Sequence, residues 1–219
     1  MKLRWRLGLF FVYPLAKLLL GLKVIGREKI RELKGRIIAA NHTSNFDPIL
    51  LGIATQKEVC FLAKEELFKF RKWFSWLIKT WNALPVRRGA VGPNLFKTCS
   101  ELLQRNQTLV LFPEGTRNKD QKLLPFKPGV GFLAVTNSVP VVPCYITGVR
   151  DSFVSKIVDP DINPSKIRVS DFWKSRITVR FGDPILPNGF NRNRTDYERF
   201  AIKVQNEVEK LRCEGKEKQ

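Results

Sequence analysis

Residues 36–54, RIIAANHTSNFDPILLGIA, contain the local pattern that decides the fold. Arg36 to Ala40 is a short, largely apolar run that ends in a polar loop, which is typical of a buried strand. Asp47 and Pro48 precede a second apolar run, and aspartate before proline is typical of a helix N-cap followed by the first helical residue. The stretch therefore predicts a strand, a polar loop and a helix in succession.

The same alternation continues along the chain. Further strands are expected at residues 59–63, 108–113, 139–147 and 177–181. Further helices are expected at residues 67–84, 93–106 and 128–136, and from the capping box Thr195-Asp196-Tyr197-Glu198 onward. Pro140 and Pro143 indicate an edge strand or a bulge, because proline lacks the N–H that a central strand donates. The alternation predicts an α/β fold, a single domain with a mixed sheet flanked by helices.

The N-terminal stretch 5–22, WRLGLFFVYPLAKLLLGL, is the most apolar part of the chain. As a helix it would be about 27 Å long, close to the thickness of a bilayer core. Arg6 and Lys17 interrupt it, Pro14 would kink it, and basic residues flank both ends. A helix that lies in or dips into one leaflet is the favoured interpretation, with a core helix and a membrane span as alternatives.

Residues 67–84 combine aromatic and basic side chains at helical spacing. One predicted face carries Phe70, Trp73, Phe74, Leu77, Ile78 and Trp81. Another carries Lys69, Lys72 and Lys79, with Trp76 among them. Two interpretations are open: a helix packed on the core, and a basic aromatic helix at a membrane interface, where tryptophan and lysine are both favourable.

The chain of 219 residues has 39 Lys and Arg against 20 Asp and Glu, a formal charge of +19. Such an excess predicts an anionic partner, which can be a nucleic acid, an acidic bilayer or a phosphorylated substrate. A hydrophobic fraction of 43% excludes a disordered or collagen-like protein. The 4 cysteines form no CxxC pattern and His42 is the 1 histidine, so zinc sites with several histidines are excluded.

His42 and Asp47 are the first candidate pair for chemistry. Their loop follows a predicted strand, where α/β folds place functional groups. The loop can bring the carboxylate to one imidazole nitrogen, which leaves the other nitrogen to accept a proton from a substrate. The alternative is structural: Asp47 caps its helix and His42 is an ordinary loop residue.

The segment FPEGTR, which follows another predicted strand, is the second candidate. Its arginine, Arg117, can bind a phosphate through two N–H groups, and Gly115 lets a ligand approach the backbone. The alternative is a turn with solvated charges. Further cations that are either phosphate ligands or ordinary surface charges are Lys64, Arg87, Arg88 and Lys127.

Together these segments resemble the glycerolipid acyltransferases of the lysophosphatidic acid acyltransferase type. NHTSNFDP resembles the NHx4D motif of that family, and FPEGTRN is similar to its FPEGTRS motif, with Asn118 in place of serine. The intervening FLAKEELF and LPVRRG resemble its lysine-bearing and arginine-bearing segments, and VPVVPCYI resembles its proline-rich motif. The likeness runs from about Lys34 to Gly148 and, more loosely, to Pro184.

The resemblance implies a role for each matching residue. His42 matches the general base of the family, and Asp47 matches its carboxylate partner. The matching substrate-binding positions are Lys64, Arg88, Glu114, Gly115, Thr116, Arg117 and Lys127, with Arg87 a neighbour of Arg88. Backbone N–H groups near His42 or Gly115, or the Lys64 ammonium, are the candidates for stabilising negative charge on the reacting carbonyl. The resemblance implies no metal and no bound cofactor.

The resemblance further implies a reaction and a location. A fatty acyl group would move from acyl-CoA or acyl carrier protein to the 2-hydroxyl of 1-acyl-sn-glycerol 3-phosphate (lysophosphatidic acid), making phosphatidic acid in phospholipid biosynthesis. The expected organisation is a membrane-docking helical segment at 1–30, a catalytic domain at 31–213 and a charged tail at 214–219. The expected location is the cytoplasmic face of the cell membrane, as a peripheral or monotopic protein on an anionic surface, with no nucleic-acid partner.

Two alternatives stay open. The same chemistry can act on another acceptor, such as glycerol 3-phosphate or another lysolipid. A non-catalytic basic module that binds anionic membrane or nucleic acid is the alternative from a different class. It rests on charge alone, because the sequence contains no recognised nucleic-acid-binding motif.

Overall fold

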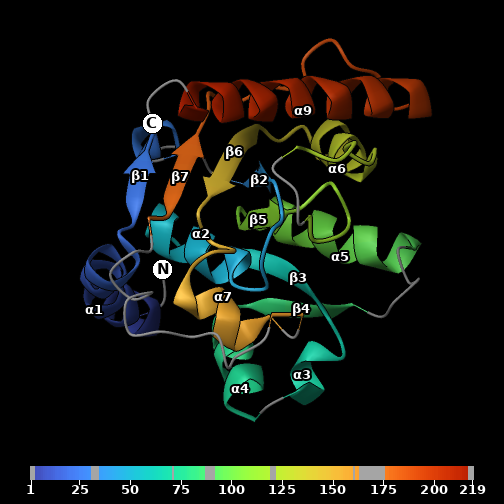
Figure 1. The fold of residues 1–219 in the computed structure, drawn as a ribbon. Helices are drawn as coiled ribbons and strands as arrows, with labels where there is room; N and C mark the ends of the chain where they lie inside the picture. Colours follow the sequence, from blue (N-terminus) through green and yellow to red (C-terminus); the bar gives the residue numbers. More distant parts are fainter. Residues whose placement is uncertain are drawn as a thin grey trace.

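The strands form one mixed sheet in the computed structural model, which describes residues 3–30, 35–70, 72–86, 92–118, 122–159, 161–162 and 176–216 (Figure 1). They are Lys23–Ile25 (β1), Arg36–Ala40 (β2), Cys60–Lys64 (β3), Ala83–Val86 (β4), Thr108–Leu111 (β5), Val141–Thr147 (β6) and Thr178–Phe181 (β7). In this part of the chain their order is β1-β7-β6-β2-β5-β3-β4. Neighbouring strands are parallel except β6 and β7, which are antiparallel, so the predicted mixed α/β sheet is confirmed.

Helices cover both faces of this sheet (Figure 1). They are Leu3–Leu20 (α1), Asp47–Thr55 (α2), Leu67–Phe70 (α3), Lys72–Thr80 (α4), Pro93–Gln104 (α5), Gly129–Asn137 (α6), Phe153–Val158 (α7) and Arg194–Lys216 (α9), with a 3-10 helix at Arg27–Ile30 (η1). Ile38 and Ala40 of β2 belong to the core on the side of α1 and α2. Ile37 and Ala39 belong to the core on the side of α5, α6 and α9. Because both faces are covered, β2 needs apolar side chains on both.

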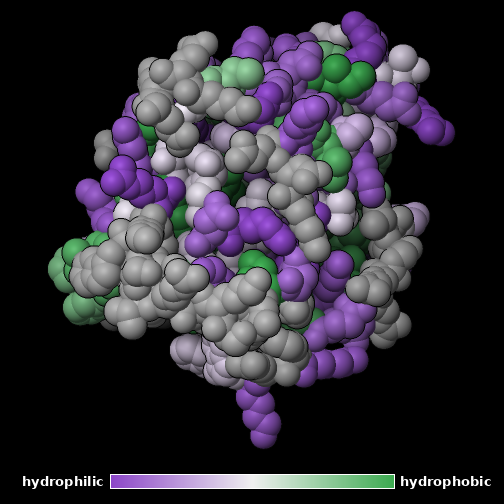
Figure 2. Space-filling view, viewed as in Figure 1, coloured by the Kyte–Doolittle hydropathy of each residue, from purple (hydrophilic) through white to green (hydrophobic). Residues whose placement is uncertain are grey.

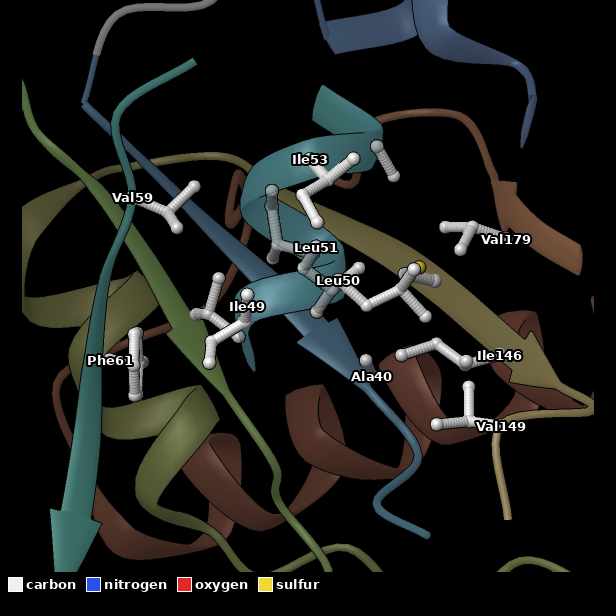
Figure 3. Packing of buried hydrophobic residues seen from close by; sticks show 14 of the residues in the cluster. Ala40, Ile49, Leu50, Leu51, Ile53, Val59, Phe61, Ile146, Val149 and Val179 are labelled. Atoms are coloured by element: carbon white, nitrogen blue, oxygen red, sulfur yellow. The ribbon is translucent and has the colours of Figure 1, made fainter. Parts of the chain in front are cut away.

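α2 lies at the centre of one face of the sheet. All of its residues, from Asp47 to Thr55, are buried. Figure 3 shows its side chains between Phe61 of β3 and Ile146 of β6. A helix that is apolar on all sides is stable only when it is surrounded. This packing fixes Asp47, the first residue of α2, beside the loop that carries His42.

The parallel strands β2, β3, β5 and β6 bring their carboxyl ends to one edge of the sheet. Ala39 pairs with Leu111 across β2 and β5, and Ala40 pairs with Cys144 across β2 and β6. The loops after β2 and β5, which hold the two candidate segments, therefore start side by side at the edge where α/β folds place their sites.

The single helix expected at 67–84 is wrong. The chain instead forms α3, α4 and then β4, which pairs in parallel with β3. Asn82 has a left-handed φ of 57°, which turns the chain out of α4 and into the sheet. Ile78 is buried whereas Trp73 and Trp76 are exposed, so the expected grouping of Trp73 with Ile78 on one face is not observed.

Among the α1 side chains that the structure describes, those buried against the sheet domain lie on one side of the helix. Its buried residues are Trp5, Leu9, Ala16 and Leu20. Trp5 contacts the half-buried Trp81, with ring centroids 4.7 Å apart. Within the ranges given above, no helix is long and apolar enough to cross a membrane. The side chains of Phe70, Phe74 and Leu77, which were expected on the same aromatic face as Trp81, lie outside the described residues.

β1 follows α1 and lies at one edge of the described sheet, with β4 at the other. It pairs in parallel with β7, Lys23 opposite Thr178. Arg27 then joins α1 to α2, because its side chain donates to the Tyr13 hydroxyl at 2.6 Å and to the Ala54 carbonyl at 2.8 Å. The expected boundary between the N-terminal segment and the catalytic domain, at residue 30, lies after β1, so that segment includes one strand of the sheet.

β6 is an interior strand although it contains Pro143. It lies between β2 and β7, so the expected edge position is wrong. The backbone of Pro143 faces β7, because its carbonyl accepts the N–H of Gly182 at 2.8 Å. The regular pairing of β6 with β7 runs from Cys144 to Thr147 and ends at Phe181 of β7. Pro143 lies just outside this pairing, so its missing N–H interrupts no hydrogen bond between the two strands.

The last helix begins earlier and ends later than expected. The side chain of Asn193, not that of Thr195, accepts the N–H of Asp196 at 2.8 Å, so the predicted capping box is wrong by two residues. α9 extends into the expected tail at 214–219, of which residues 217–219 lie outside the described part. The predicted apolar face is confirmed as buried at Phe200, Val204, Val208 and Leu211.

Candidate active site

His42 and Asp47 form a hydrogen-bonded pair at the carboxyl edge of the sheet. His42 lies in the loop after β2, and its Nδ1 is 2.9 Å from Asp47 Oδ2. The same oxygen accepts the backbone N–H groups of Thr43 at 2.6 Å and Ser44 at 2.8 Å. Asp47 does not cap α2 as expected, because the N-cap is Phe46 and the carboxylate turns back to the loop. The geometry favours the catalytic interpretation of this pair over the structural one.

The environment of this pair suits a general base. The Asp47 side chain is 0% exposed and that of His42 is 18% exposed, so the carboxylate is shielded while the imidazole reaches the surface. The bond at Nδ1 leaves Nε2 without a partner among the described residues. Phe112 stacks on the imidazole, with ring centroids 4.1 Å apart and an interplanar angle of 21°. The ring orientation is therefore fixed from two directions.

Glu114 links the loop after β5 to the loop after β2. Its Oε1 accepts the backbone N–H of His42 at 3.2 Å, and its Oε2 accepts that of Leu124 at 3.3 Å. Asn118 adds a second link, because its N–H donates to the His42 carbonyl at 2.6 Å. Burial raises the pKa of Glu114, and the hydrogen bonds from His42 and Leu124 oppose this shift. Both carboxylate oxygens of Glu114 thus accept backbone N–H groups of the loops. This gives Glu114 a structural role that sequence alone does not reveal.

Gly115 and Lys127 lie against each other in the second loop. Gly115 has a φ of +72°, and a Cβ built on it would lie 2.6 Å from Lys127 Nζ. The Lys127 N–H also donates to the Pro113 carbonyl at 2.9 Å. Glycine is therefore needed both for the backbone conformation and for the approach of the lysine. Thr116, the next residue, is exposed.

Arg117 is held by two carboxylates that sequence reasoning missed. Its Nη1 is 2.7 Å from Asp159 Oδ1 and 2.9 Å from Asp161 Oδ1. Both aspartates follow α7, which was not expected either. No sequence motif marks them, because the contact joins segments 42 residues apart.

Of the remaining predicted cations, the structure describes Lys64 but not Arg87 or Arg88. Lys64 is the last residue of β3 and is exposed at the same carboxyl edge. Arg88 and its neighbour Arg87 lie outside the described residues.

The structure narrows the candidates for stabilising an oxyanion. The N–H groups of His42, Thr43 and Ser44 already donate to carboxylates. The N–H of Gly115 donates to the Phe112 carbonyl at 3.0 Å. Of the expected candidates, these bonds leave the Lys64 ammonium and the backbone N–H of Thr116, to which the described residues offer no acceptor.

Asn41, the first residue of the NHTSNFDP segment, fixes the start of the His42 loop. Its side chain donates to the Ile146 carbonyl at 2.9 Å and accepts the Ile146 N–H at 2.7 Å. A buried amide that bonds both backbone groups of one residue sets the spacing between β2 and β6. The asparagine of this segment is thus structural.

A cavity of about 650 Å³ opens at the opposite edge of the sheet and does not touch this site. Arg36, Gln56, Asn82 and Asn106 contribute to its lining. The charged residues of its lining are Arg36, Lys57 and Glu58. Burial lowers the pKa of Arg36.

Comparison with known proteins identifies the family of the chain. The family model described as Acyltransferase matches residues 21–147, more than half of the chain and including both loops of the site. The chain belongs to this acyltransferase family. The resemblance inferred from the two motifs is confirmed.

Individual relatives of this acyltransferase have known names. The 1-acyl-sn-glycerol-3-phosphate acyltransferase of Bacillus subtilis is 33% identical over 129 residues, which cover 58% of this chain and 63% of that protein. The protein of the same name from Saccharomyces cerevisiae is 30% identical over 202 residues, which cover 90% of this chain and 62% of that protein. The chain therefore spans less than two thirds of the length of these curated relatives.

A solved structure has a similar fold. The crystal structure of the 1-acyl-sn-glycerophosphate (LPA) acyltransferase PlsC from Thermotoga maritima matches with a TM-score of 0.66 and 27% sequence identity. The match covers 95% of this chain and 78% of that chain. It supports the mixed sheet flanked by helices as the scaffold of the site.

Proposed function

We propose that this acyltransferase moves a fatty acyl group from acyl-CoA or acyl carrier protein to the 2-hydroxyl of 1-acyl-sn-glycerol 3-phosphate. The product is phosphatidic acid. The observation that carries the proposal is the pair of His42 Nδ1 and Asp47 Oδ2, 2.9 Å apart, with Nε2 left for a substrate proton. The names of the relatives support the choice of substrate.

The reaction needs one base and one site for developing negative charge. His42 Nε2 removes the proton of the 2-hydroxyl as its oxygen attacks the thioester carbonyl. Asp47 stabilises the imidazolium that forms and keeps Nδ1 protonated. Lys64 stabilises the charge that develops on the carbonyl oxygen. When the carbonyl re-forms, the carbon–sulfur bond breaks and the thiolate receives the proton from His42, so no acyl-enzyme is required.

The acceptor phosphate binds to the cations around the second loop. Arg117 and Lys127 come from that loop, and Arg88 is assigned to the same role from its sequence position. Gly115 and Thr116 give the ligand access to the exposed backbone between them. A phosphate monoester carries close to two negative charges at neutral pH, so several cations are needed to hold it.

The protein docks on a membrane through α1. The outer side of α1 exposes Phe10 (73%) and Phe11 (69%), together with Leu15 and Leu18. Figure 2 shows hydrophobic surface at the lower left of the molecule, where Figure 1 places α1. Trp73 and Trp76 of α4 are exposed as well, and tryptophan suits a lipid interface. The charge of +19 favours the anionic cytoplasmic face of the cell membrane.

An acceptor panel tests this function. Purified protein is given acyl-CoA or acyl carrier protein with lysophosphatidic acid, glycerol 3-phosphate or another lysolipid. We expect turnover with lysophosphatidic acid, and a loss of about 10²–10⁴ in rate for His42→Ala. Ile202→Ala, a surface change on the far face of the sheet, is the matched control. Near-normal turnover by His42→Ala would refute the mechanism, and turnover of only another acceptor would replace the substrate.

A further inference from the structure

Asp159 is a buried carboxylate that contacts both loops of the site. It follows α7, and its side chain is 0% exposed. Its Oδ1 accepts the backbone N–H of Asn45, in the loop between His42 and Asp47, at 2.8 Å. The same oxygen is 2.7 Å from Arg117 Nη1. One oxygen atom therefore joins the loop of the base to the arginine of the second loop.

α7 holds Asp159 in place through further contacts with the same loop. The Asn45 side chain donates to the Val158 carbonyl at 3.3 Å. The Ser155 hydroxyl, also in α7, lies 2.7 Å from the Ser44 hydroxyl, and both groups are buried. Asp159 thus rests on a rigid support rather than on an exposed loop.

The contacts of Arg117 leave one side of its guanidinium open. Asp159 and Asp161 both contact Nη1. Toward the residues that the structure describes, Nε and Nη2 make no hydrogen bond. Nε and Nη2 form the two-donor edge that binds a phosphate with two parallel hydrogen bonds.

We propose that Asp159 is a positioning residue for the acyl transfer, which holds Arg117 with its Nε–Nη2 edge toward the acceptor phosphate and holds the His42 loop through Asn45. The inference rests on the proposed function. Asp159 touches neither the base nor the phosphate, and it acts through Arg117 and Asn45. An arginine held before the substrate arrives loses less side-chain entropy on binding.

One oxygen of Asp159 has no partner within the described part of the chain, so a substitution at this residue can remove its charge with little change of shape. Its Oδ2 is buried without a hydrogen-bond partner among the described groups. In Asp159→Asn the amide oxygen can keep the bond from Asn45, and the NH₂ group takes the place of Oδ2, where no donor is displaced. The variant removes the charge that holds Arg117 and keeps the shape. Asp159→Ala removes both contacts.

The kinetic test separates these two contacts. For Asp159→Asn we expect the KM of lysophosphatidic acid to rise about tenfold, the size of one lost charged hydrogen bond, with the donor KM and kcat nearly unchanged. For Asp159→Ala we expect kcat to fall as well. The double variant Asp159→Asn/Arg117→Ala should be no worse for the acceptor than Arg117→Ala alone. Asp151→Asn, an exposed aspartate in the same segment, is the matched control.

Additive effects of Asp159→Asn and Arg117→Ala on acceptor KM would overturn the proposal, as would a rise in donor KM alone. A second measurement is independent of substrate. Hydrogen exchange of a peptide over residues 41–48 should be about tenfold faster in Asp159→Ala than in the wild type and unchanged in Asp151→Asn. Unchanged exchange in Asp159→Ala would also overturn it. A third outcome separates the two proposals. If exchange is faster in Asp159→Ala as expected, but the wild-type protein does not acylate lysophosphatidic acid, the proposed function is refuted and the contact of Asp159 with the loop is not.

Discussion

The ring of Phe112 stacks on the imidazole of His42, with centroids 4.1 Å apart. The register of the sheet brings the two residues to the same edge, because Ala39 of β2 pairs with Leu111 of β5, and His42 and Phe112 follow these residues by three positions and one position. It supports the imidazole on one flat side while Asp47 fixes its Nδ1 edge. The first residue of the FPEGTRN segment thus belongs to the positioning of the base.

Replacing Phe112 should lower turnover more than it lowers stability. For Phe112→Ala we expect kcat to fall about tenfold, since a stacked ring contact contributes roughly 1 kcal/mol to the orientation of its partner. Phe112→Leu should recover stability but not kcat, because it restores volume without a flat surface. Steady-state kinetics and thermal unfolding measure the two effects. Phe190→Leu, which alters a ring contact with Phe200 on the other face, is the control, and full activity of Phe112→Leu would contradict the role.

Asp47 should tolerate no neutral replacement. In Asp47→Asn the side chain cannot stabilise the imidazolium, so we expect kcat to fall by about 10²–10⁴ with an intact fold. Asp47→Ala should also lower the free energy of unfolding by about 2 kcal/mol, because it leaves the N–H groups of Thr43 and Ser44 without their acceptor. Denaturant unfolding and turnover assays measure both. Equal stability of Asp47→Ala and wild type would show that these two bonds do not stabilise the loop.

Glu114 should make folding stability depend on pH. Burial raises its pKa in the folded protein above the ordinary value of 4.5, so the folded state binds the proton more tightly than the unfolded state. This contribution to stability is present below pH 4.5 and is lost as the pH rises through the raised pKa of the folded protein. In Glu114→Gln it is absent at every pH.

We therefore expect the free energy of unfolding of the wild type, relative to Glu114→Gln, to fall as the pH rises from 4.5 toward 7. Urea unfolding at several pH values measures the difference, and the subtraction removes the other titrating groups. Parallel pH profiles for the two proteins would contradict the prediction.

Membrane binding should depend on the outer side of α1. Replacing Phe10, Phe11, Leu15 and Leu18 by serine removes apolar area worth roughly 1.5 kcal/mol or more per side chain, so vesicle binding should fall well over tenfold. The buried side of α1 is untouched, so the fold should persist. High salt should release the wild type only in part, because the apolar contribution is not screened.

Vesicle flotation with and without anionic lipid measures this binding. Trp73→Ala/Trp76→Ala tests whether α4 belongs to the same surface. Ile202→Ser, which is 56% exposed on α9, is the control. Equal flotation of the α1 variant and the control would exclude α1 as the docking surface.

The sequence by itself determined the parts of this protein that depend on neighbouring residues. Alternating apolar runs and polar loops predicted the mixed α/β sheet, because a strand covered on both faces must be largely apolar, as β2 is after Arg36. The spacing of His42 and Asp47 indicated that the two side chains can meet, since the loop at 41–46 joins a strand end to the next helix, and the structure shows the contact. The two motif segments also indicated the family that the comparisons confirm.

Only the tertiary structure decided what depends on residues far apart in the chain. Pro143 could enter an interior strand because β7 ends beside it, and the helix expected at 67–84 was broken because β3 offered a partner for β4. Glu114 and Asp159 acquired their roles the same way. Glu114 bonds the backbone of His42 across 72 positions, and Asp159 bonds that of Asn45 across 114. Local pattern encodes no such contact, because it forms only when the sheet brings separate loops to one edge.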